Sequence, residues 1–181
     1  MAAQVGSTEA FTRLIEAEAP AALRLCRAIL RSEAEAQDAT QEAWIRAWRD
    51  LPSLRAPGAW PAWFRRITVR AAIDRGRRRA VREVSADRLL GEAVAPIDDA
   101  SAGVGARDEM RRAFAGLSTD DRAVLALRFY ADLEVPDVAT ALGIPLGTAK
   151  SRLHRALARL ERGIVASRSG TGTEANPREV I

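Results

Sequence analysis

The stretch ALGIPLGTAKSRLHRALARL, residues Ala141 to Leu160, places a Gly-Ile-Pro turn directly before a basic amphipathic segment. Gly143 can adopt the left-handed conformation that ends a helix. Pro145 suits the first turn of a new helix and prevents continuation of the previous one. The stretch therefore predicts a short helix over 135–142 and a second helix over 146–163, which together form a helix-turn-helix.

The second of these helices has two distinct faces. Apolar residues at helical spacing predict a buried stripe; they are Ala149, Leu153, Ala156, Leu157 and Leu160. Polar residues of the first turns lie off this stripe, where a recognition helix meets base edges and phosphates; they are Lys150, Ser151, His154 and Arg155. Two interpretations follow, a DNA-binding helix or an ordinary helical hairpin with a solvated basic face.

Helical periodicity also extends through the first half of the chain. Apolar positions between Phe11 and Leu30 are three and four apart, and Pro20 is expected to kink or break this helix. Ser32 with Glu35 predicts a capped helix over 33–50. The segment LPSLRAPG, 51–58, predicts a loop, and an apolar stripe from residue 60 begins a helix that continues into DRGRRRAVR. Strand-type alternation is not evident, so the sequence predicts an all-α fold.

The helical pattern stops in the acidic segment SADRLLGEAVAPIDDASAGVG, 85–105. Its composition predicts an interdomain linker. Periodicity resumes at Met110, and Ser118 with Asp121 predicts a capped helix through Tyr130. We therefore expect two small helical domains, 8–82 and 107–165, a flexible acidic linker over 83–106, and a disordered tail over 166–181.

Charge is strongly segregated along the chain. Residues 65–82 contain eight arginines and one acidic residue, whereas residues 83–110 contain seven acidic and two basic residues. The first of these segments is the electrostatic footprint expected where a protein meets phosphates. A polar helix face carries Asp38, Gln41 and Glu42 at i, i+3 and i+4, opposite an alanine stripe. That face could dock on a basic partner or simply be solvated.

The composition disfavours several other classes of protein. A single cysteine, Cys26, excludes an intramolecular disulfide and a CxxC metal or redox site. The lone His154 has no second histidine with which to share a metal, and no catalytic cluster is evident. The N-terminal segment does not resemble a signal peptide, and no apolar run approaches the roughly 20 residues that span a bilayer. We expect a cytoplasmic, non-enzymatic protein with no cofactor, no metal and no membrane insertion.

Three segments of the chain carry a resemblance to a known family. They are EAQDATQEAWIRAW at 35–48, AWFRRITVRAAIDRGRRR at 62–79 and GIPLGTAKSRLHRA at 143–156. In this order they resemble the sigma-70 family of bacterial RNA polymerase sigma factors, in its extracytoplasmic function (ECF) group. The resemblance implies a protein that binds core RNA polymerase, directs it to a two-part promoter and helps to open the DNA. The implied partners are core RNA polymerase, through the clamp helices of its largest subunit and through the polymerase flap, double-stranded and melted promoter DNA and, in many relatives, an anti-sigma factor.

The resemblance also implies roles for individual residues. Core polymerase would bind Asp38, Gln41, Glu42, Ile45 and Arg46. The minus-ten element would be melted and held by Trp60, Arg65, Arg66, Arg70, Asp74, Arg75, Arg77, Arg78 and Arg79, because aromatic and arginine planes stack on bases while cations follow phosphates. The minus-thirty-five element would be read by Thr148, Lys150, Ser151, Arg152, His154, Arg155 and Arg159, with Arg155 on a base edge and Arg159 on a phosphate. Trp63 and Phe64 fit the apolar stripe better and are expected in the core.

The chain departs from the family pattern at three positions. Arg70 replaces a common asparagine, and Asp132 and Glu134 stand where glycine and a capping serine are common. A stand-alone helix-turn-helix regulator is the alternative function, but it leaves the polar face at 38–42 and the arginine cluster unexplained. A nucleic-acid-processing enzyme explains less still, because the sequence contains no paired carboxylates or Gly-rich phosphate loop.

Overall fold

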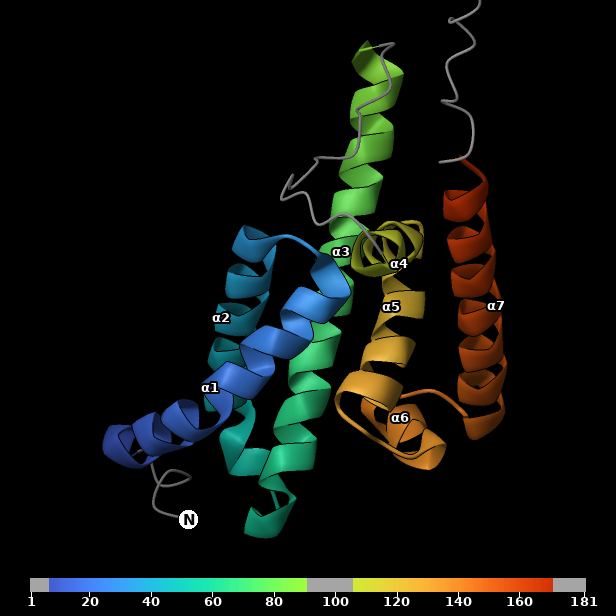
Figure 1. Cartoon of the computed structure of the whole chain (residues 1–181). Coiled ribbons are helices and arrows are strands. Elements are labelled where there is room, and N and C mark those ends of the chain that lie inside the picture. Colours follow the sequence, from blue (N-terminus) through green and yellow to red (C-terminus); the bar gives the residue numbers. More distant parts are fainter. Residues whose placement is uncertain (1–6, 91–105, 171–181) are drawn as a thin grey trace, which may run out of the picture.

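The structure, a computed structural model, describes residues 7–90 and 106–170. Every regular element in these ranges is a helix, which confirms the all-α prediction (Figure 1). The first unit contains α1 (Thr8–Leu30), α2 (Glu33–Asp50), the short 3-10 helices Leu51–Ser53 and Pro57–Ala59, and α3 (Trp60–Leu90). The second unit contains α4 (Ala106–Ala115), α5 (Thr119–Leu125), the π-helical turn Ala126–Tyr130, α6 (Val135–Leu142) and α7 (Leu146–Gly170).

Local capping explains where several helices begin and end. The side-chain oxygens of Ser7, Ser32 and Ser118 accept hydrogen bonds from backbone N–H groups three residues ahead, which satisfies donors that a helix N-terminus leaves free. Gly143 ends α6 with a φ of 65°, and its N–H donates to the carbonyl oxygen of Thr140 at 3.2 Å. The predicted bounds of the helices 33–50 and 135–142 are therefore confirmed.

The entry to α6 reflects both departures from the family pattern. Asp132 has a φ of 49°, a conformation that glycine adopts more readily. Glu134 is the N-cap residue of α6 but makes no side-chain capping hydrogen bond. Both carboxylates instead lie within 4 Å of the Arg128 guanidinium, at 3.6 and 3.9 Å. The two carboxylates thus pair with Arg128, and the N-terminus of α6 receives no capping hydrogen bond from Glu134.

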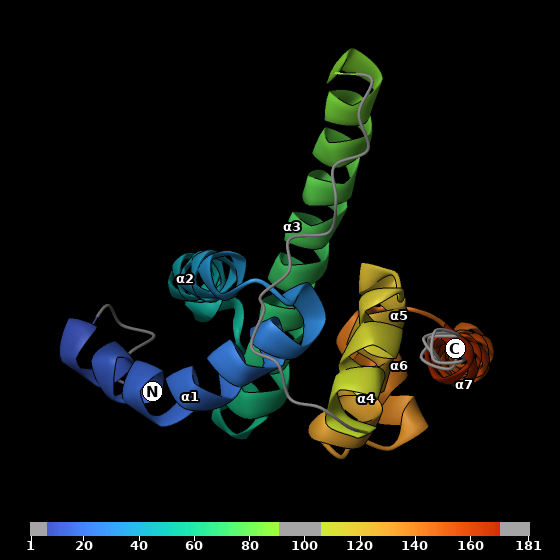
Figure 2. The ribbon, with the colours of Figure 1, turned by 45° about the horizontal axis from the view of Figure 1, so that its top comes forward.

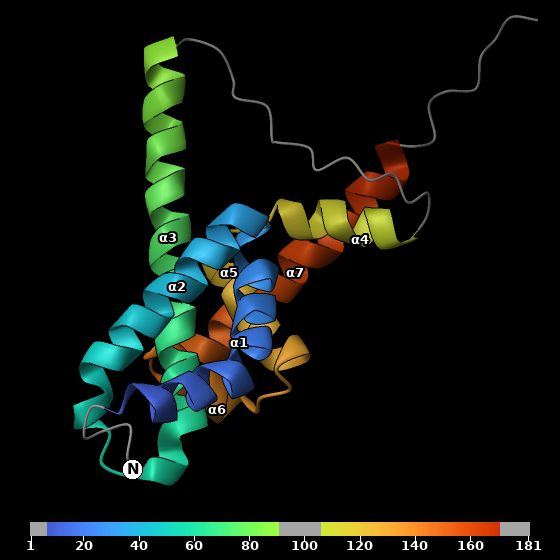
Figure 3. The same ribbon diagram turned by 90° about the vertical axis from the view of Figure 1, so that its left-hand side faces the viewer.

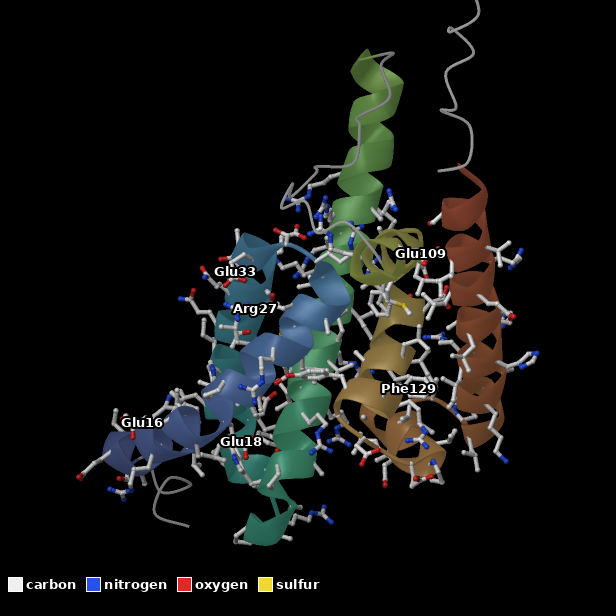
Figure 4. The ribbon with its side chains drawn as sticks, viewed as in Figure 1. Glu16, Glu18, Arg27, Glu33, Glu109 and Phe129 are labelled. Carbon is white, nitrogen blue, oxygen red and sulfur yellow. The ribbon has the colours of Figure 1, made fainter. Side chains whose placement is uncertain are left out.

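Helix α1 continues through Pro20, so of the two expected outcomes, a kink or a break, the break is wrong. Pro20 is exposed, and the carbonyl of Glu16 that loses its helical partner can turn toward water. Buried residues on both sides of the proline, Phe11 and Ile29, hold the helix against the rest of the unit. Near the end of α1, Arg27 Nε donates to Glu33 Oε2 at 2.6 Å and connects α1 to α2 (Figure 4).

An aromatic cluster forms much of the core of the first unit. Trp60 stacks on Phe64 with ring centroids 5.2 Å apart, and Phe64 stacks on Trp44 at 3.9 Å. Phe64 is 2% exposed, as expected for a core residue. Trp60 is also only 4% exposed, although it is predicted to stack on DNA bases. The structure contradicts that stacking role, because the rings of Phe11, Trp44, Trp63 and Phe64 already lie around the indole.

Two helices are longer than the sequence predicts. Helix α3 continues to Leu90 through the first part of the expected linker, and its second half rises away from the other helices (Figure 2). Helix α7 continues to Gly170, past the expected start of the tail. Neither extension contains an internal glycine or proline that would stop the helix. The remaining parts of the predicted linker and tail, 91–105 and 171–181, lie outside the described residues.

The two units share one hydrophobic core, which the prediction of two separate small domains does not include. Buried side chains of α1, α2 and α3 form a single cluster with buried side chains of α5, α6 and α7. Helices α5 and α6 pack beside α3, and α5 also packs against α1 (Figures 1 and 3). Ile29, Val124, Leu127 and Val138 are 0% exposed within this cluster. The hydrophobic surface of each unit is therefore partly buried by the other.

Candidate nucleic-acid interface

The outer face of α7 carries the predicted recognition patch. Lys150, Ser151, His154 and Arg155 are exposed, whereas Ala149 on the opposite side is 0% exposed. Arg155 Nε donates to the carbonyl oxygen of Ser151 at 3.2 Å. A bond of this kind on an exposed helix surface is easily exchanged for a bond to a base edge. The four side chains are thus available to a ligand outside the protein.

The buried stripe of α7 is narrower than predicted. Ala149 and Ala156 are 0% exposed and Leu153 and Leu160 are half-buried, but Leu157 is 39% exposed. Each step along a helix rotates the side chain by about 100°. Because Ala156 occupies the centre of the stripe, the next residue is turned toward solvent.

Two other arginines of α7 bind α5. Arg152 Nη1 lies 2.8 Å from Asp120 Oδ1, and Arg159 pairs with Asp121. The Asp121 side chain is only 6% exposed and lies in the first turn of α5, where the helix dipole favours a negative charge. These ion pairs attach the recognition helix to its neighbour. Thr148, also predicted to contact DNA, is half-buried at the start of α7.

The acidic face of α2 meets the basic face of α3. Arg75 pairs with Asp38, and Arg78 Nη2 lies 3.1 Å from Glu42 Oε2. The Arg78 and Asp38 side chains are more than half exposed, and exposed ion pairs of this kind stabilise a fold by about 0–1 kcal/mol. Residues predicted to bind polymerase and residues predicted to hold DNA are therefore paired with each other, although the Arg75 and Glu42 side chains are only 25% and 29% exposed.

The row of ion pairs between α2 and α3 continues along both helices. Arg46 lies between Glu42 and Asp74, with its Nη1 3.2 Å from Asp74 Oδ2. Arg79 Nη1 lies 3.2 Å from Glu35 Oε2. Asp74 thus orients Arg46, and its side chain remains 40% exposed. Glu35 is absent from the predicted site, and only its helical spacing from Asp38 and Glu42 signals that it belongs to the same face.

A hollow of about 480 Å³ lies beside the end of α2 and the first half of α3. Arg46, Arg49, Arg66 and Arg70 line it together with Trp63. Arg66 and Arg70 are exposed and make no ion pair with a carboxylate within the described ranges. Cations around an aromatic ring suit a nucleic-acid strand, since the ring stacks on a base while the cations hold phosphates. Sequence reasoning missed Arg49, which sits in the last turn of α2 and has no helical periodicity with the α3 arginines.

The exposed face of α2 combines polar and apolar groups. Asp38 and Gln41 are exposed, Ile45 is 62% exposed, and Trp48 one turn further is 40% exposed. The opposite side is fully buried, as expected, at Ala36, Ala39, Ala43 and Ala47. Large apolar side chains beside polar ones on a helix surface are typical of a protein-binding site.

Other kinds of site find less support. In the part of the chain that the structure describes, no three His, Cys, Asp or Glu side chains gather as a metal site. Across those same residues, no helix combines the length and apolar character needed to cross a membrane. Cys26 is 0% exposed, and burial raises the pKa of its thiol to about 11, so the thiol is protonated at neutral pH.

Comparison with known families and proteins agrees with this geometry. The family description Sigma-70 region 2 matches residues 14–82, and Sigma-70, region 4 matches residues 107–160. The RNA polymerase sigma-E factor of Streptomyces coelicolor is 30% identical over 90% of this chain and 90% of its own length. The ECF RNA polymerase sigma factor SigM of Mycobacterium tuberculosis is 34% identical over 87% of this chain and 78% of its own length.

Solved structures share the fold. The sigma factor RpoE from Bartonella quintana, determined in complex with the anti-sigma factor NepR, matches with a TM-score of 0.65 and 24% identity, covering 87% of this chain and 98% of that one. CnrH, determined with the cytosolic domain of CnrY, matches with a TM-score of 0.60 and 23% identity, covering 91% of this chain and 93% of that one.

Proposed function

The chain belongs to the sigma-70 family and is a sigma factor of its extracytoplasmic function group, and on this premise we propose which residues carry out each step of initiation. A sigma factor of this kind binds core RNA polymerase, directs it to promoters and helps to open the DNA. Residues 8–82 act as the polymerase-docking and minus-ten unit, and residues 107–165 act as the minus-thirty-five unit. Residues 83–106 connect them, and 166–181 form a tail.

Core polymerase docks on the exposed face of α2. Asp38, Gln41 and Glu42 supply polar contacts, and the exposed Ile45 supplies an apolar anchor. Arg46 holds Glu42 from the same helix and keeps its carboxylate in place. A polar rim around an apolar centre is the usual anatomy of a protein interface. The clamp helices of the largest subunit are the partner that fits this face, and the flap is the partner of the second unit.

The minus-ten strand follows the arginines of α3 and enters the hollow beside them. Arg66 and Arg70 hold phosphates or stack on bases at the hollow. Arg65, Arg75, Arg77, Arg78 and Arg79 continue the cationic track along α3. Trp60 supports the aromatic core beneath this surface. Trp63, which the sequence predicts in the core, is only half-buried at the wall of the hollow and takes the stacking role instead.

The minus-thirty-five element is read by the outer face of α7. Lys150, Ser151, His154 and Arg155 reach base edges, and Arg155 can make the bidentate contact that guanine favours. Arg152 and Arg159 have intrachain carboxylate partners, so their contribution to DNA binding depends on exchanging those partners.

The protein works in the cytoplasm, where its polymerase and promoter partners are, and it has no enzymatic activity of its own. An anti-sigma factor is a further partner, because the structural relative RpoE from Bartonella quintana was determined in complex with the anti-sigma factor NepR.

One observation favours a sigma factor over a stand-alone regulator. The chain carries both an exposed recognition patch on α7 and a separate hollow with arginines around Trp63 on the first unit. A helix-turn-helix regulator needs only the first of these surfaces. The second surface serves single-stranded DNA, which a regulator of duplex operators does not hold.

Run-off transcription with purified core RNA polymerase on genomic fragments tests the proposal. We expect discrete transcripts that depend on the added chain, and loss of these transcripts with Arg155→Ala. Arg162→Ala is the matched control, because Arg162 is also an exposed arginine of α7 whose Nε donates to the carbonyl oxygen four residues earlier at 3.2 Å. Tight, sequence-specific gel shifts by the chain alone, without chain-dependent transcripts, would instead identify a stand-alone regulator.

A further inference from the structure

We propose that the hollow beside α2 and α3 binds a free purine nucleoside diphosphate, with the base on Trp63 and the phosphates on Arg66 and Arg70. The ligand is a small molecule, so this site goes beyond the promoter contacts assigned above. Competition between the nucleotide and the minus-ten strand follows from the shared side chains, and that part also rests on the proposed function.

The hollow has the size of a small-molecule site. Its volume is about 480 Å³, and ligand pockets are typically about 300–1,000 Å³. Its lining comes from the end of α2, the segment that follows α2, the first half of α3 and the turn before α7. Gly143 of that turn reaches the hollow because α6 packs beside α3 (Figure 1). Walls from four segments suit a compact ligand.

Trp63 supplies a surface on which a base can stack. Its indole is half-buried at the wall of the hollow. The ring centroid of Trp60, which is 4% exposed, lies 5.6 Å from that of Trp63 and helps to fix its position. Ile67, one turn further along α3, lines the same hollow and adds an apolar contact. Every base has a planar face that stacks on an aromatic ring, and a purine covers more of the ring than a pyrimidine.

Two guanidinium groups of the hollow are available to phosphates. Arg66 and Arg70 are exposed, and neither pairs with a carboxylate among the described side chains. They are four residues apart on α3, so they are neighbours on the helix surface. A guanidinium group binds phosphate oxygens through two parallel N–H donors. The two groups can therefore hold two successive phosphates.

The other two arginines of the hollow already have carboxylate partners. Arg46 pairs with Glu42 and Asp74. Arg49 donates from Nε and Nη2 to the Asp50 carboxylate at 2.7 and 3.1 Å. Four guanidinium groups and a single carboxylate line the hollow, which gives it a positive potential. A diphosphate suits this potential, because it carries about three negative charges at neutral pH when its terminal phosphate is fully ionised.

The nucleotide and the minus-ten strand would use the same side chains. Arg66, Arg70 and Trp63 are the groups assigned above to a phosphate backbone and a base of that strand. One indole face stacks on one base at a time, and a guanidinium group that holds one phosphate in this fork geometry has few donors left for another. A bound nucleotide therefore competes with the strand for the hollow.

Isothermal titration calorimetry of the full chain with GDP and with ADP measures the site directly. We expect saturable binding of one nucleotide per chain, with a Kd of about 1 mM or tighter. Guanosine lacks the phosphates and inorganic pyrophosphate lacks the base. Each should bind about tenfold more weakly than GDP or worse, because a stacked base and charge-assisted hydrogen bonds both contribute to affinity.

Variants of the lining identify the groups that bind. Arg66→Ala with Arg70→Ala should raise the Kd for GDP by about tenfold or more. Its matched control is Arg13→Ala with Arg55→Ala, which removes the same charge from exposed positions that do not line the hollow. Trp63→Ala should raise the Kd by about tenfold, whereas Trp63→Phe keeps an aromatic ring and should change it by about threefold or less. Circular dichroism verifies that each variant keeps its helices.

A fluorescent GDP derivative tests the competition with DNA in the holoenzyme. The bound derivative is measured by fluorescence anisotropy above the signal of core polymerase alone. We expect a pre-melted promoter to release it, and an equal concentration of unrelated duplex DNA to leave it bound. Run-off transcription by the same holoenzyme is measured in parallel.

Four results would overturn the nucleotide site. They are no saturable binding of GDP or ADP, equal affinity for GDP and pyrophosphate, equal affinity of the double variant Arg66→Ala, Arg70→Ala and its control, and an unchanged Kd in folded Trp63→Ala. Retention of the derivative on the pre-melted promoter complex, with normal transcription, would overturn the competition. Absence of transcripts would reject the proposed function, while calorimetry of the free chain would still decide whether the nucleotide site exists.

Discussion

Replacing Arg159 by alanine separates a structural arginine from a DNA-reading one. In the structure Arg159 pairs with Asp121, whose side chain is 6% exposed. Leaving a buried charged group without its partner costs about 1–3 kcal/mol. The position of Asp121 in the first turn of α5 offsets about 0.3–1 kcal/mol of this, because the helix dipole favours a negative charge there. We therefore expect Arg159→Ala to lower the free energy of unfolding by about 1–2 kcal/mol.

Arg155→Ala and Arg162→Ala provide matched comparisons on the same helix. Both arginines are exposed and each donates only to the carbonyl oxygen four residues earlier among the hydrogen bonds of the described residues. Surface substitutions of this kind change stability by no more than about 0.5 kcal/mol. Thermal melts followed by circular dichroism should show a fall in Tm of about 2–8 °C for Arg159→Ala and little change for the other two.

The same three variants have different expected effects on promoter recognition. Competition binding of holoenzyme to a library of minus-thirty-five variants should show a flattened preference for Arg155→Ala, with a loss of about 1–3 kcal/mol in discrimination. Arg159→Ala and Arg162→Ala should preserve the rank order. If Arg159→Ala melts like Arg162→Ala and lowers the salt slope by about one unit, Arg159 contacts a phosphate and the ion pair with Asp121 is not what holds it.

Three further predictions concern the docking face of α2, the hollow beside α3 and the buried Cys26. Asp38→Arg with Glu42→Arg should abolish co-purification with core polymerase while the helical signal stays near that of the parent chain; undiminished binding would show that α2 is not the docking face. Arg66→Ala with Arg70→Ala should reduce permanganate reactivity of promoter thymines and leave core binding intact, with partial recovery on a pre-melted template; equal reactivity would remove the hollow from strand opening. Because the folded pKa of Cys26 is raised to about 11 from 9.0, folding stability should fall as pH rises from about 9 toward 11, and in chemical denaturation at several pH values this fall should be smaller for Cys26→Ala.

Much of the local structure follows from the sequence. Ser32, Ser118 and Gly143 act over three or four residues, so their capping chemistry predicts helix ends without knowledge of distant contacts. Helical spacing likewise predicts which side of a helix is buried, as the alanine stripe of α2 shows. The tendency of proline to end a helix does not decide the outcome at Pro20. Helix α1 continues there because packing on both sides of the proline holds the helix.

Which partner each arginine binds follows only from the tertiary structure. Arg66 and Arg77 belong to the same basic run in the sequence, yet Arg66 lines a hollow while Arg77 binds Asp120 of α5, 43 residues away. Arg155 and Arg159 are one helical turn apart, yet only Arg159 meets a buried carboxylate. Sequence spacing describes the face of one helix, but it does not say which helix that face will meet.

The sequence alone determined the all-α fold, the helix-turn-helix and the family, because each depends on short-range patterns that recur at known spacings. Tertiary structure decided that Trp60 is core, that Leu157 is exposed, and that the two units share one hydrophobic cluster. Burial of apolar surface is non-directional, so a helix face specifies that it needs a partner and not which partner it takes. That choice is made by the whole chain at once, and here it brings Arg77 and Arg152 onto one oxygen of Asp120.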